Sequence, residues 1–390
     1  MFPNKKYSTA LAISEAKHTP TFSSYIMVQT LTPPTTESVM EIMQKMGHEN
    51  LVFCQDEHSG LRAIIGIHST VLGPALGGTR MWNYATSNEA VTDALRLSRG
   101  MSYKNSIAGL NLGGGKAVII GNARTQKNEA LLRRFGKFVE SLNGKYITAE
   151  DVGMTTVDMS YIAMETKHVT GLDENRGGSG DPSPFTALGT YMGMKAAAKK
   201  MYGSDSLEGK KVSIQGAGHV GEYIIEHLSK EGAKIYVTDV YEDRLKEISD
   251  KYKVEIVGLE EIYDLDVDIY SPCALGATIN DETLSRLKCQ IIAGCANNQL
   301  KDETIHGNAC LERGIIYVPD FLINSGGVIN VYSEFASLPR EWVVQKTERL
   351  YDMCLEVINT SVSENKNAQD VAIQIAQDRI DAIANIKTRR

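Results

Sequence analysis

Apolar residues recur with changing period along the first half of the chain, and each period predicts an element. Helical spacing over 37–46 predicts a first helix, which Gly47 would end. Two strand-like runs, 51–56 and 61–68, flank a turn that contains Ser59 and Gly60, as is typical of a hairpin. The pattern then predicts a helix that Ser87 caps and that runs to about Met101, a strand over 117–120, a helix over 129–142, a strand over 146–149 and a helix over 155–166. These elements indicate a first α/β domain.

A segment rich in glycine and proline, 171–184, separates this half from a regular alternation of strands and helices. After a long helix over 185–201, strands are predicted at 211–215, 234–239, 268–271, 290–294 and 314–318, and helices lie between them. This alternation predicts a doubly wound parallel sheet. We therefore expect an α/β fold with a disordered extension at 1–36, a first domain at 37–175, a Rossmann domain at 176–345 and C-terminal helices at 346–390 that pack back on the first domain.

Composition narrows the class of partner. The 390 residues carry a formal net charge of -7 and no run of basic residues interleaved with aromatics, so we expect no binding to nucleic acid. No apolar run approaches the roughly 18 to 20 residues of a membrane span, which leaves small molecules as the expected partners. Met1–Ile26 lacks the apolar region of a secretory signal. We expect a cytoplasmic protein, with organellar targeting by this segment as the alternative.

The cysteines are scattered, and none forms a pair or cluster at metal-ligand spacing. We therefore expect buried free thiols in a reducing compartment and no metal site. The six are Cys54, Cys273, Cys289, Cys295, Cys310 and Cys354.

A glycine-rich motif in the second domain predicts a dinucleotide site. Gly216-Ala217-Gly218-His219-Val220-Gly221 follows a predicted strand and precedes a predicted helix, and Asp239 ends the next strand 21 residues after Gly218. Such a loop brings backbone N–H groups and a helix N-terminus against a pyrophosphate. Asp239 would accept hydrogen bonds from the ribose hydroxyls and repel a 2′-phosphate, so NAD is the expected cofactor. His219 is expected to be a helix N-terminal residue without a catalytic role.

Three polar residues stand at predicted element ends in the first domain. Lys116 follows Gly113-Gly114-Gly115, Lys104 lies just past the helix that ends near Met101, and Asp151 closes the strand over 146–149. We interpret the three glycines as a turn that lets backbone and small ligands approach the ammonium. Burial and a second cation can lower the pKa of such a lysine and prepare it for base chemistry. The alternative is two surface lysines and a helix-capping aspartate.

Several motifs in this order resemble those of the glutamate, leucine, phenylalanine and valine dehydrogenase family. They are Pro74-Ala-Leu-Gly-Gly-Thr-Arg80, Met101-Ser-Tyr-Lys-Asn105, Asn111-Leu-Gly-Gly-Gly-Lys116, Ala149-Glu-Asp-Val-Gly153 and the loop at 216–221. The resemblance runs from about Glu37 to the C-terminus and implies that 37–175 binds substrate and forms a homo-oligomer, with an octamer as the expected size. It also implies that Lys116 is the catalytic lysine, that Lys104 holds the substrate α-carboxylate and that Asp151 moves protons to and from the amine.

The resemblance further implies NAD-dependent, reversible oxidative deamination of L-amino acids to 2-oxo acids and ammonia. Glutamate enzymes of the family place a cation where Leu76 stands, and a distal carboxylate buried beside a leucine would cost several kcal/mol. Branched aliphatic amino acids are therefore the expected substrates; the alternatives are a phenylalanine or valine enzyme, or an inactive NAD-binding regulatory protein. By resemblance the substrate site is lined by Leu76, Gly77, Gly78, Met101, Ala149, Val328 and Val331, and the nicotinamide and its ribose lie near Asn297 and Asn324.

Overall fold

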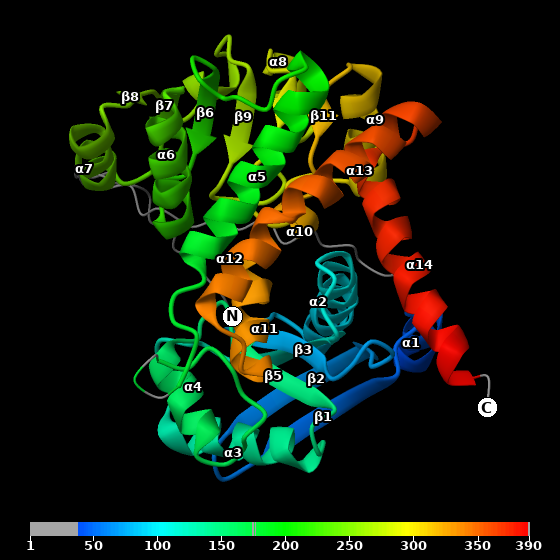
Figure 1. Cartoon of the computed structure of the whole chain (residues 1–390). Helices are drawn as coiled ribbons and strands as arrows, with labels where there is room; N and C mark the ends of the chain where they lie inside the picture. The colour runs from blue at the N-terminus through cyan, green and yellow to red at the C-terminus, as the bar shows by residue number, and fades with distance from the viewer. Residues whose placement is uncertain (1–37, 174, 176, 389–390) are drawn as a thin grey trace, which may run out of the picture. The chain divides into compact units, whose positions relative to one another are not determined.

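Two separate β-sheets organise the chain (Figure 1). The computed structural model describes residues 38–173, 175 and 177–388. The chain divides into two units, Met1–Ser38 and Val39–Arg390, and the fold below is that of the second unit. The expectations of a disordered extension at 1–36 and of targeting by Met1–Ile26 lie outside the described residues. The domain limits expected at 175/176 and 345/346 stay predictions.

The first sheet has the strand order β1-β2-β4-β3-β5. β1 and β2 form the predicted antiparallel hairpin, β2 and β4 are also antiparallel, and β3 runs parallel to both β4 and β5. Apolar side chains of α2 pack with Ile64 and Val118 on one face, whereas α3 and α4 pack with Ala63 and Ala117 on the other. The elements are α1 Val39–Met46, β1 Asn50–Asp56, β2 Leu61–Ser69, β3 Ala75–Trp82, α2 Ser87–Ile107, β4 Gly113–Ile120, α3 Glu129–Ser141, β5 Tyr146–Glu150 and α4 Thr156–Ala163.

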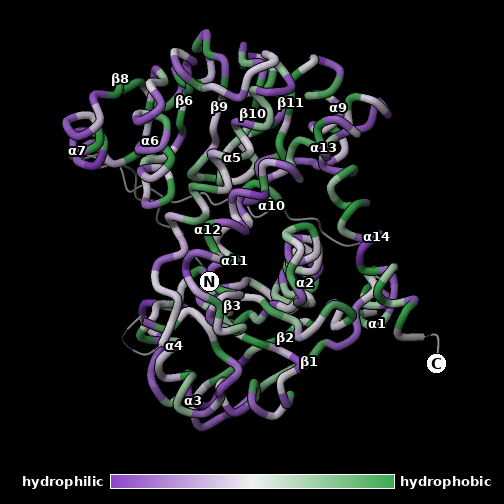
Figure 2. The backbone as a smooth tube through the Cα atoms, in the orientation of Figure 1, coloured by the Kyte–Doolittle hydropathy of each residue, from purple (hydrophilic) through white to green (hydrophobic). Residues whose placement is uncertain are grey.

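The second sheet is entirely parallel, with the order β11-β10-β9-β6-β7-β8, so the predicted doubly wound sheet is confirmed. The strand β8 was not predicted. Hydrophilic residues predominate on α7, which buries only Leu245 and Ile248 (Figure 2). The elements are α5 Ser183–Tyr202, β6 Lys211–Gln215, α6 His219–Glu231, β7 Lys234–Thr238, α7 Glu242–Tyr252, β8 Glu255–Ile256, the 3₁₀ helix η2 Glu261–Tyr263, β9 Ile269–Pro272, α8 Asp281–Arg286, β10 Ile291–Ile292, α9 Glu303–Glu312 and β11 Ile316–Tyr317.

After β11 the described chain is helical, and α13 and α14 confirm the helices predicted over 346–390. The last helix, α14, contacts α2. Ser106 Oγ donates a hydrogen bond to the Ala376 carbonyl at 2.7 Å, and Arg379 Nη1 donates to the Leu110 carbonyl at 2.8 Å. The C-terminal helix is thus bonded to the element that carries Lys104. The helices are α10 Asp320–Ile323, α11 Gly326–Ala336, α12 Arg340–Glu348, α13 Leu350–Glu364 and α14 Ala368–Thr388.

Helix α2 is longer than predicted, and Lys104 lies inside its last turn and not past its end. Three polar residues after Met101, namely Ser102, Asn105 and Ser106, are buried and each makes a hydrogen bond: Asn105 Nδ2, for example, donates to the Gly113 carbonyl at 2.6 Å. Polar side chains bonded in this way can continue a buried helix. The N-cap was also misassigned, because the side chain of Thr86, and not that of Ser87, accepts the Glu89 N–H.

The glycine turn was wrong as well, because Gly113, Gly114 and Gly115 belong to strand β4. What matters at these three positions is the absence of a side chain, since none of the three glycines has a positive φ. A Cβ on Gly113 would lie 1.9 Å from the Ser69 carbonyl oxygen, and one on Gly114 would lie 2.2 Å from the Ser102 backbone nitrogen. These glycines let α2 and neighbouring backbone pack directly on the strand that carries Lys116.

All six cysteines are free, as expected, and all but the half-buried Cys273 are buried. Within 38–173, 175 and 177–388, no helix is long and apolar enough to cross a membrane. The same residues contain no group of three or more His, Cys, Asp or Glu side chains that could hold a metal ion.

Candidate active site

Strand pairing brings the predicted substrate residues of the first domain to one face of the sheet. Leu76 pairs with Gly114 and Arg80 with Val118, which puts Lys116 on the same face, between these two pairs. Ala149 pairs with Gly78, so it shares this face too. Val118 packs against α2, and the Lys116 ammonium therefore lies on the α2 side of the sheet.

Lys116 is paired with Asp151. Its Nζ donates to Asp151 Oδ2 at 2.6 Å, and the lysine side chain is only 8% exposed. Burial lowers the pKa of Lys116; the carboxylate of Asp151 opposes this shift and the cation of Arg80 adds to it. For Asp151, burial favours a higher pKa, but Lys116 and Arg80 together hold its pKa below the ordinary value. The pair is a base and a carboxylate in one hydrogen bond, as proton transfer requires.

Lys104 completes the cationic group from α2. Burial lowers the pKa of Lys104 to about 8; Asp320 opposes the shift and Lys116 adds to it. Asp320, at the start of α10, accepts hydrogen bonds from the backbone N–H groups of Gln299 at 3.2 Å and Phe321 at 2.7 Å. We call the part of the chain built on the mixed sheet the first lobe and the part built on the parallel sheet the second lobe. A carboxylate of the second lobe therefore faces the lysine predicted to hold the substrate carboxylate.

Apolar residues from both lobes meet beside these charges. Leu76, only 2% exposed, and Val328 belong to one hydrophobic cluster, and Met101 and Val331 pack against it. Ala149 is buried but lies outside that cluster. The β3–β4 pairing is interrupted at Gly77 and Gly78, where a Cβ on Gly77 would lie 1.7 Å from the Gly115 carbonyl oxygen. These two glycines allow close backbone approach next to Lys116.

The glycine motif has the geometry of a dinucleotide loop. Gly216 has a φ of +113°, which favours glycine, and a Cβ on Gly221 would lie 2.2 Å from the Gly216 carbonyl oxygen. Gly218 is the N-cap of α6, and a Cβ there would meet nothing within 4 Å, so the helix N-terminus is open to a ligand. Ala217 and Val220 lie within this loop and first turn, and the exposed His219 begins α6, as predicted.

Asp239 follows β7 and holds the loop. Its Oδ2 accepts the Ala217 N–H at 2.7 Å, and its Oδ1 accepts the Tyr241 N–H at 3.1 Å. Each oxygen keeps acceptor capacity for a ribose hydroxyl. We missed Arg244, whose Nε donates to the Ala217 carbonyl at 3.0 Å. Its guanidinium is neutralised by Glu222 and Glu247, so it offers no free cation for a 2′-phosphate.

Asn297 and Asn324 lie together near the carboxyl end of β10. Asn324 Nδ2 donates to Asn297 Oδ1 at 2.8 Å and to the Cys295 carbonyl at 3.1 Å. Asn297 is exposed, whereas Asn324 is 3% exposed and its Oδ1 has no hydrogen-bond partner among the described residues. A buried acceptor without a partner is costly, and an amide N–H of a nicotinamide would satisfy it. The second lobe therefore fits a dinucleotide on its own geometry.

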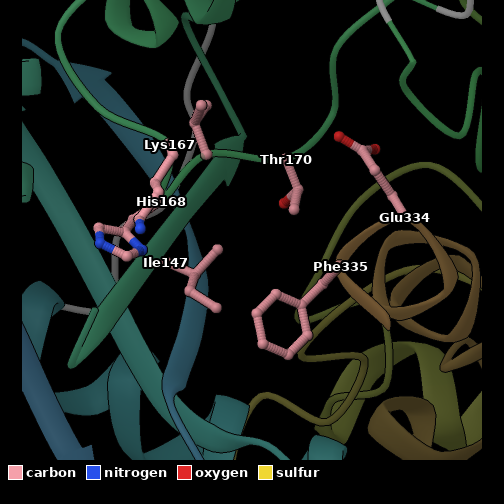
Figure 3. Close-up of a pocket in the computed structure, with 7 residues that line it drawn as sticks. Ile147, Lys167, His168, Thr170, Glu334 and Phe335 are labelled. Carbon is pink, nitrogen blue, oxygen red and sulfur yellow. The ribbon is translucent and has the colours of Figure 1, made fainter. Parts of the chain in front are cut away.

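The segment between the two lobes is held by Glu334 of α11. Glu334 Oε2 accepts hydrogen bonds from the Gly171 N–H at 3.1 Å, the Ser179 N–H at 3.0 Å and Ser179 Oγ at 3.0 Å. Glu334 and Phe335 also line a pocket of about 170 Å³, opposite Ile147 and Thr170 (Figure 3). None of the predicted catalytic residues lines this pocket.

Family models and known proteins match this arrangement over most of the chain. A model described as Glu/Leu/Phe/Val dehydrogenase, dimerisation domain, matches residues 48–168. A second, described as Glutamate/Leucine/Phenylalanine/Valine dehydrogenase, matches 177–241 and 236–387. The chain belongs to this dehydrogenase family. Membership agrees with the resemblance drawn from the lysine and glycine motifs.

Relatives within the family are named after different amino-acid substrates. A leucine dehydrogenase from Thermoactinomyces intermedius is 53% identical over 90% of this chain and 95% of its own length. A phenylalanine dehydrogenase from Lysinibacillus sphaericus is 45% identical over 87% and 91%. The crystal structure of L-tryptophan dehydrogenase from Nostoc punctiforme matches with a TM-score of 0.81 and 41% identity, covering 89% of this chain and 100% of that one. The family and the fold are thus shown, and the substrate depends on side chains of the site.

Proposed function

We propose that the protein is an NAD-dependent leucine dehydrogenase, which reversibly deaminates L-leucine and other branched-chain L-amino acids to 2-oxo acids and ammonia. The observation that carries the proposal is the 2.6 Å contact between Lys116 Nζ and Asp151 Oδ2, beside Lys104 and the buried Leu76. The 53% identity to a leucine dehydrogenase supports the same substrate class. An inactive regulatory protein would not need this pair of lysines and carboxylate.

Each polar residue has a separate task in this reaction. Lys104 binds the substrate α-carboxylate as its cation, and bound carboxylate would raise the lysine pKa again from about 8. Lys116, whose pKa burial lowers, takes a proton from the water that attacks the iminium carbon. Asp151 accepts and returns the proton of the leaving amine. A bound NAD would supply the acceptor for the hydride that leaves the substrate Cα.

Leu76 sets the substrate class in this proposal. A 2-oxoglutarate side chain would bury its distal carboxylate against Leu76, and an unpaired buried charge costs several kcal/mol. A branched aliphatic group would instead extend the cluster that holds Leu76 and Val328. Leucine, isoleucine and valine differ by a methylene or its position, worth only about 1 to 3 kcal/mol, so activity on all three is expected.

A panel of 2-oxo acids tests the substrate class in reductive amination with NADH and ammonium. We expect kcat/KM to be highest for 4-methyl-2-oxopentanoate and the other branched acids, lower for phenylpyruvate, and lowest for 2-oxoglutarate. Dominant phenylpyruvate activity would instead support a phenylalanine dehydrogenase. Dominant 2-oxoglutarate activity would contradict the role given to Leu76.

NAD is the cofactor we propose, because Asp239 puts a carboxylate at the end of β7. Replacing Asp239 by Ser should raise the KM for NADH and lower that for NADPH, since the repulsion of a 2′-phosphate is removed. The neighbouring Asp243→Ser, an exposed position in the first turn of α7, makes the same change of charge and should leave both values unchanged. Equal cofactor preference in Asp239→Ser and the unmodified enzyme would contradict this assignment.

We also propose a homo-oligomer, with an octamer as the expected size. The description of the model matching residues 48–168 as a dimerisation domain supports an assembly of some kind. Cytoplasmic localisation is part of the same proposal.

A further inference from the structure

A line of alternating charges continues behind Asp151. The same Oδ2 that accepts from Lys116 also accepts from Arg80 Nε at 3.2 Å. On its other side, Arg80 Nη1 donates to Asp93 Oδ2 at 3.0 Å, and the Tyr84 hydroxyl donates to that oxygen at 2.6 Å. Lysine, aspartate, arginine and aspartate thus follow one another from the sheet to α2.

The four charged side chains are largely shielded from solvent. The side chains of Arg80 and Asp151 are both 24% exposed, and that of Asp93 is 14% exposed. Charges in such places persist when they are paired, and a guanidinium can serve two carboxylates because its N–H groups point in fixed, different directions. Arg80 uses Nε for one carboxylate and Nη1 for the other, so its orientation is set by both.

Asp151 needs support from a neighbour, because it lies just past the end of β5 and outside the regular elements. The sheet therefore does not fix its side chain by strand pairing. Lys116 alone could follow a rotating carboxylate, since an ammonium on a flexible stem bonds in many directions. Arg80 removes this freedom by bonding to Oδ2 from β3. Both side-chain hydrogen bonds that the described residues give to this carboxylate go to Oδ2, and the backbone N–H of Val152 is its further donor.

We propose that Arg80, anchored by Asp93, is a positioning residue. It keeps Oδ2 of Asp151 hydrogen-bonded to Lys116 and to Arg80 itself, so that Oδ1 is the oxygen that exchanges protons with the substrate amine. The inference rests on the proposed amino-acid dehydrogenase function. Arg80 is hydrogen-bonded to Asp151 and Asp93, and it acts on the reaction through Asp151. Its effect is to hold the carboxylate in one orientation through every turnover.

Arg80 also affects the pKa values of Lys116 and Asp151. Its cation contributes to lowering the pKa of both Lys116 and Asp151. Removing Arg80 should therefore raise both values, and the rise of kcat/KM with pH in oxidative deamination should move to higher pH. The other charged or titratable groups around the pair are Asp93 and Lys104 on α2, Tyr146 and Glu150 on β5, and, facing Lys104, Asp320 of α10.

Arg80→Met tests the proposal, with Arg80→Lys and Asp93→Asn as graded variants. For Arg80→Met we expect kcat to fall by roughly 10²-fold, as for a misplaced reacting group, while the KM of the amino acid changes little. Arg80→Lys should recover part of the rate. Asp93→Asn should show a smaller loss of kcat, and its pH profile should move to lower pH, because the Asp93 carboxylate raises the pKa of Lys116. Arg96→Met is the matched control: Arg96 also approaches Asp93, at 3.7 Å, but is 48% exposed and is not bonded to Asp151.

A second measurement separates this proposal from the proposed function. The pH dependence of Lys116 modification by trinitrobenzenesulfonate, followed by peptide mass spectrometry, reports the lysine without any substrate. A higher midpoint in Arg80→Met than in the unmodified protein and Arg96→Met supports the inference, even if branched-chain amino acids prove not to be the substrates. An unchanged midpoint together with an unchanged pH profile of kcat/KM would overturn it, and urea unfolding followed by circular dichroism verifies that each variant is folded.

Discussion

Replacing Lys116 by Ala is expected to reduce turnover of L-leucine by about 10²- to 10⁴-fold, the usual contribution of general acid–base catalysis. The variant loses the buried ammonium that bonds to Asp151 at 2.6 Å and with it the base that activates water. NADH binding should survive, because the glycine loop and Asp239 belong to the other sheet. Steady-state kinetics and NADH fluorescence quenching on the same preparation measure both quantities.

Lys137→Ala is the matched control for this variant. Lys137 lies on α3, is 59% exposed, and approaches Glu165 only at 3.8 Å. Its loss should leave kcat and KM at the values of the unmodified enzyme, since exposed ion pairs contribute little. Activity of Lys116→Ala equal to that of Lys137→Ala would falsify the assignment of Lys116.

The second large effect is expected for Gly114→Ala, a change of one methyl group. The added Cβ would lie 2.2 Å from both the backbone nitrogen and the Oγ of Ser102, so α2 must move away from β4. Lys104 is two residues further along α2 and would move with it. We expect loss of roughly 1 to 3 kcal/mol of unfolding free energy from overpacking, and a fall in kcat/KM by more than ~10²-fold from the displaced carboxylate anchor.

Gly100→Ala provides the control on the same helix. A Cβ at Gly100 would meet nothing within 4 Å, so the substitution should stabilise α2 by roughly 0.5 to 1 kcal/mol and leave kinetics unchanged. Urea unfolding and kcat/KM of the two variants form a direct comparison. If Gly114→Ala were as stable and as active as Gly100→Ala, the close packing of α2 on β4 would not support the site.

Much of the fold could be predicted because its signals are local. The alternation of apolar runs and helices after residue 205 indicated the parallel sheet, and Gly216 and Asp239 lay where a dinucleotide loop requires them. The motif Gly113-Gly114-Gly115-Lys116 was interpreted as a lysine on a glycine turn, and the turn was wrong. Its glycines are strand residues that permit backbone packing, and only the tertiary neighbours Ser69 and Ser102 reveal this.

Residues that act across the chain could not be predicted from such local signals. Arg80 and Asp93 are 13 residues apart and on different elements, and only the pairing of β3 with the sheet brings Arg80 to Asp151. Asp320 faces Lys104 from another lobe, and its carboxylate is held by backbone N–H groups. The alternation of β3 could have placed Arg80 on the face of Leu76 and Gly78, and this signal was missed.

The central claim is that Lys104, Lys116 and Asp151 serve an imine that is formed with ammonia and reduced by NADH. The most direct test is NADH oxidation with 4-methyl-2-oxopentanoate, with and without ammonium, using cofactor deuterated at both C4 positions. We predict oxidation only when ammonium is present, and L-leucine carrying a single deuterium at Cα as the product. Two results would contradict the account. One is oxidation of NADH without ammonium, with reduction of the 2-oxo acid to the 2-hydroxy acid; the other is no reaction of any 2-oxo acid with NADH and ammonium.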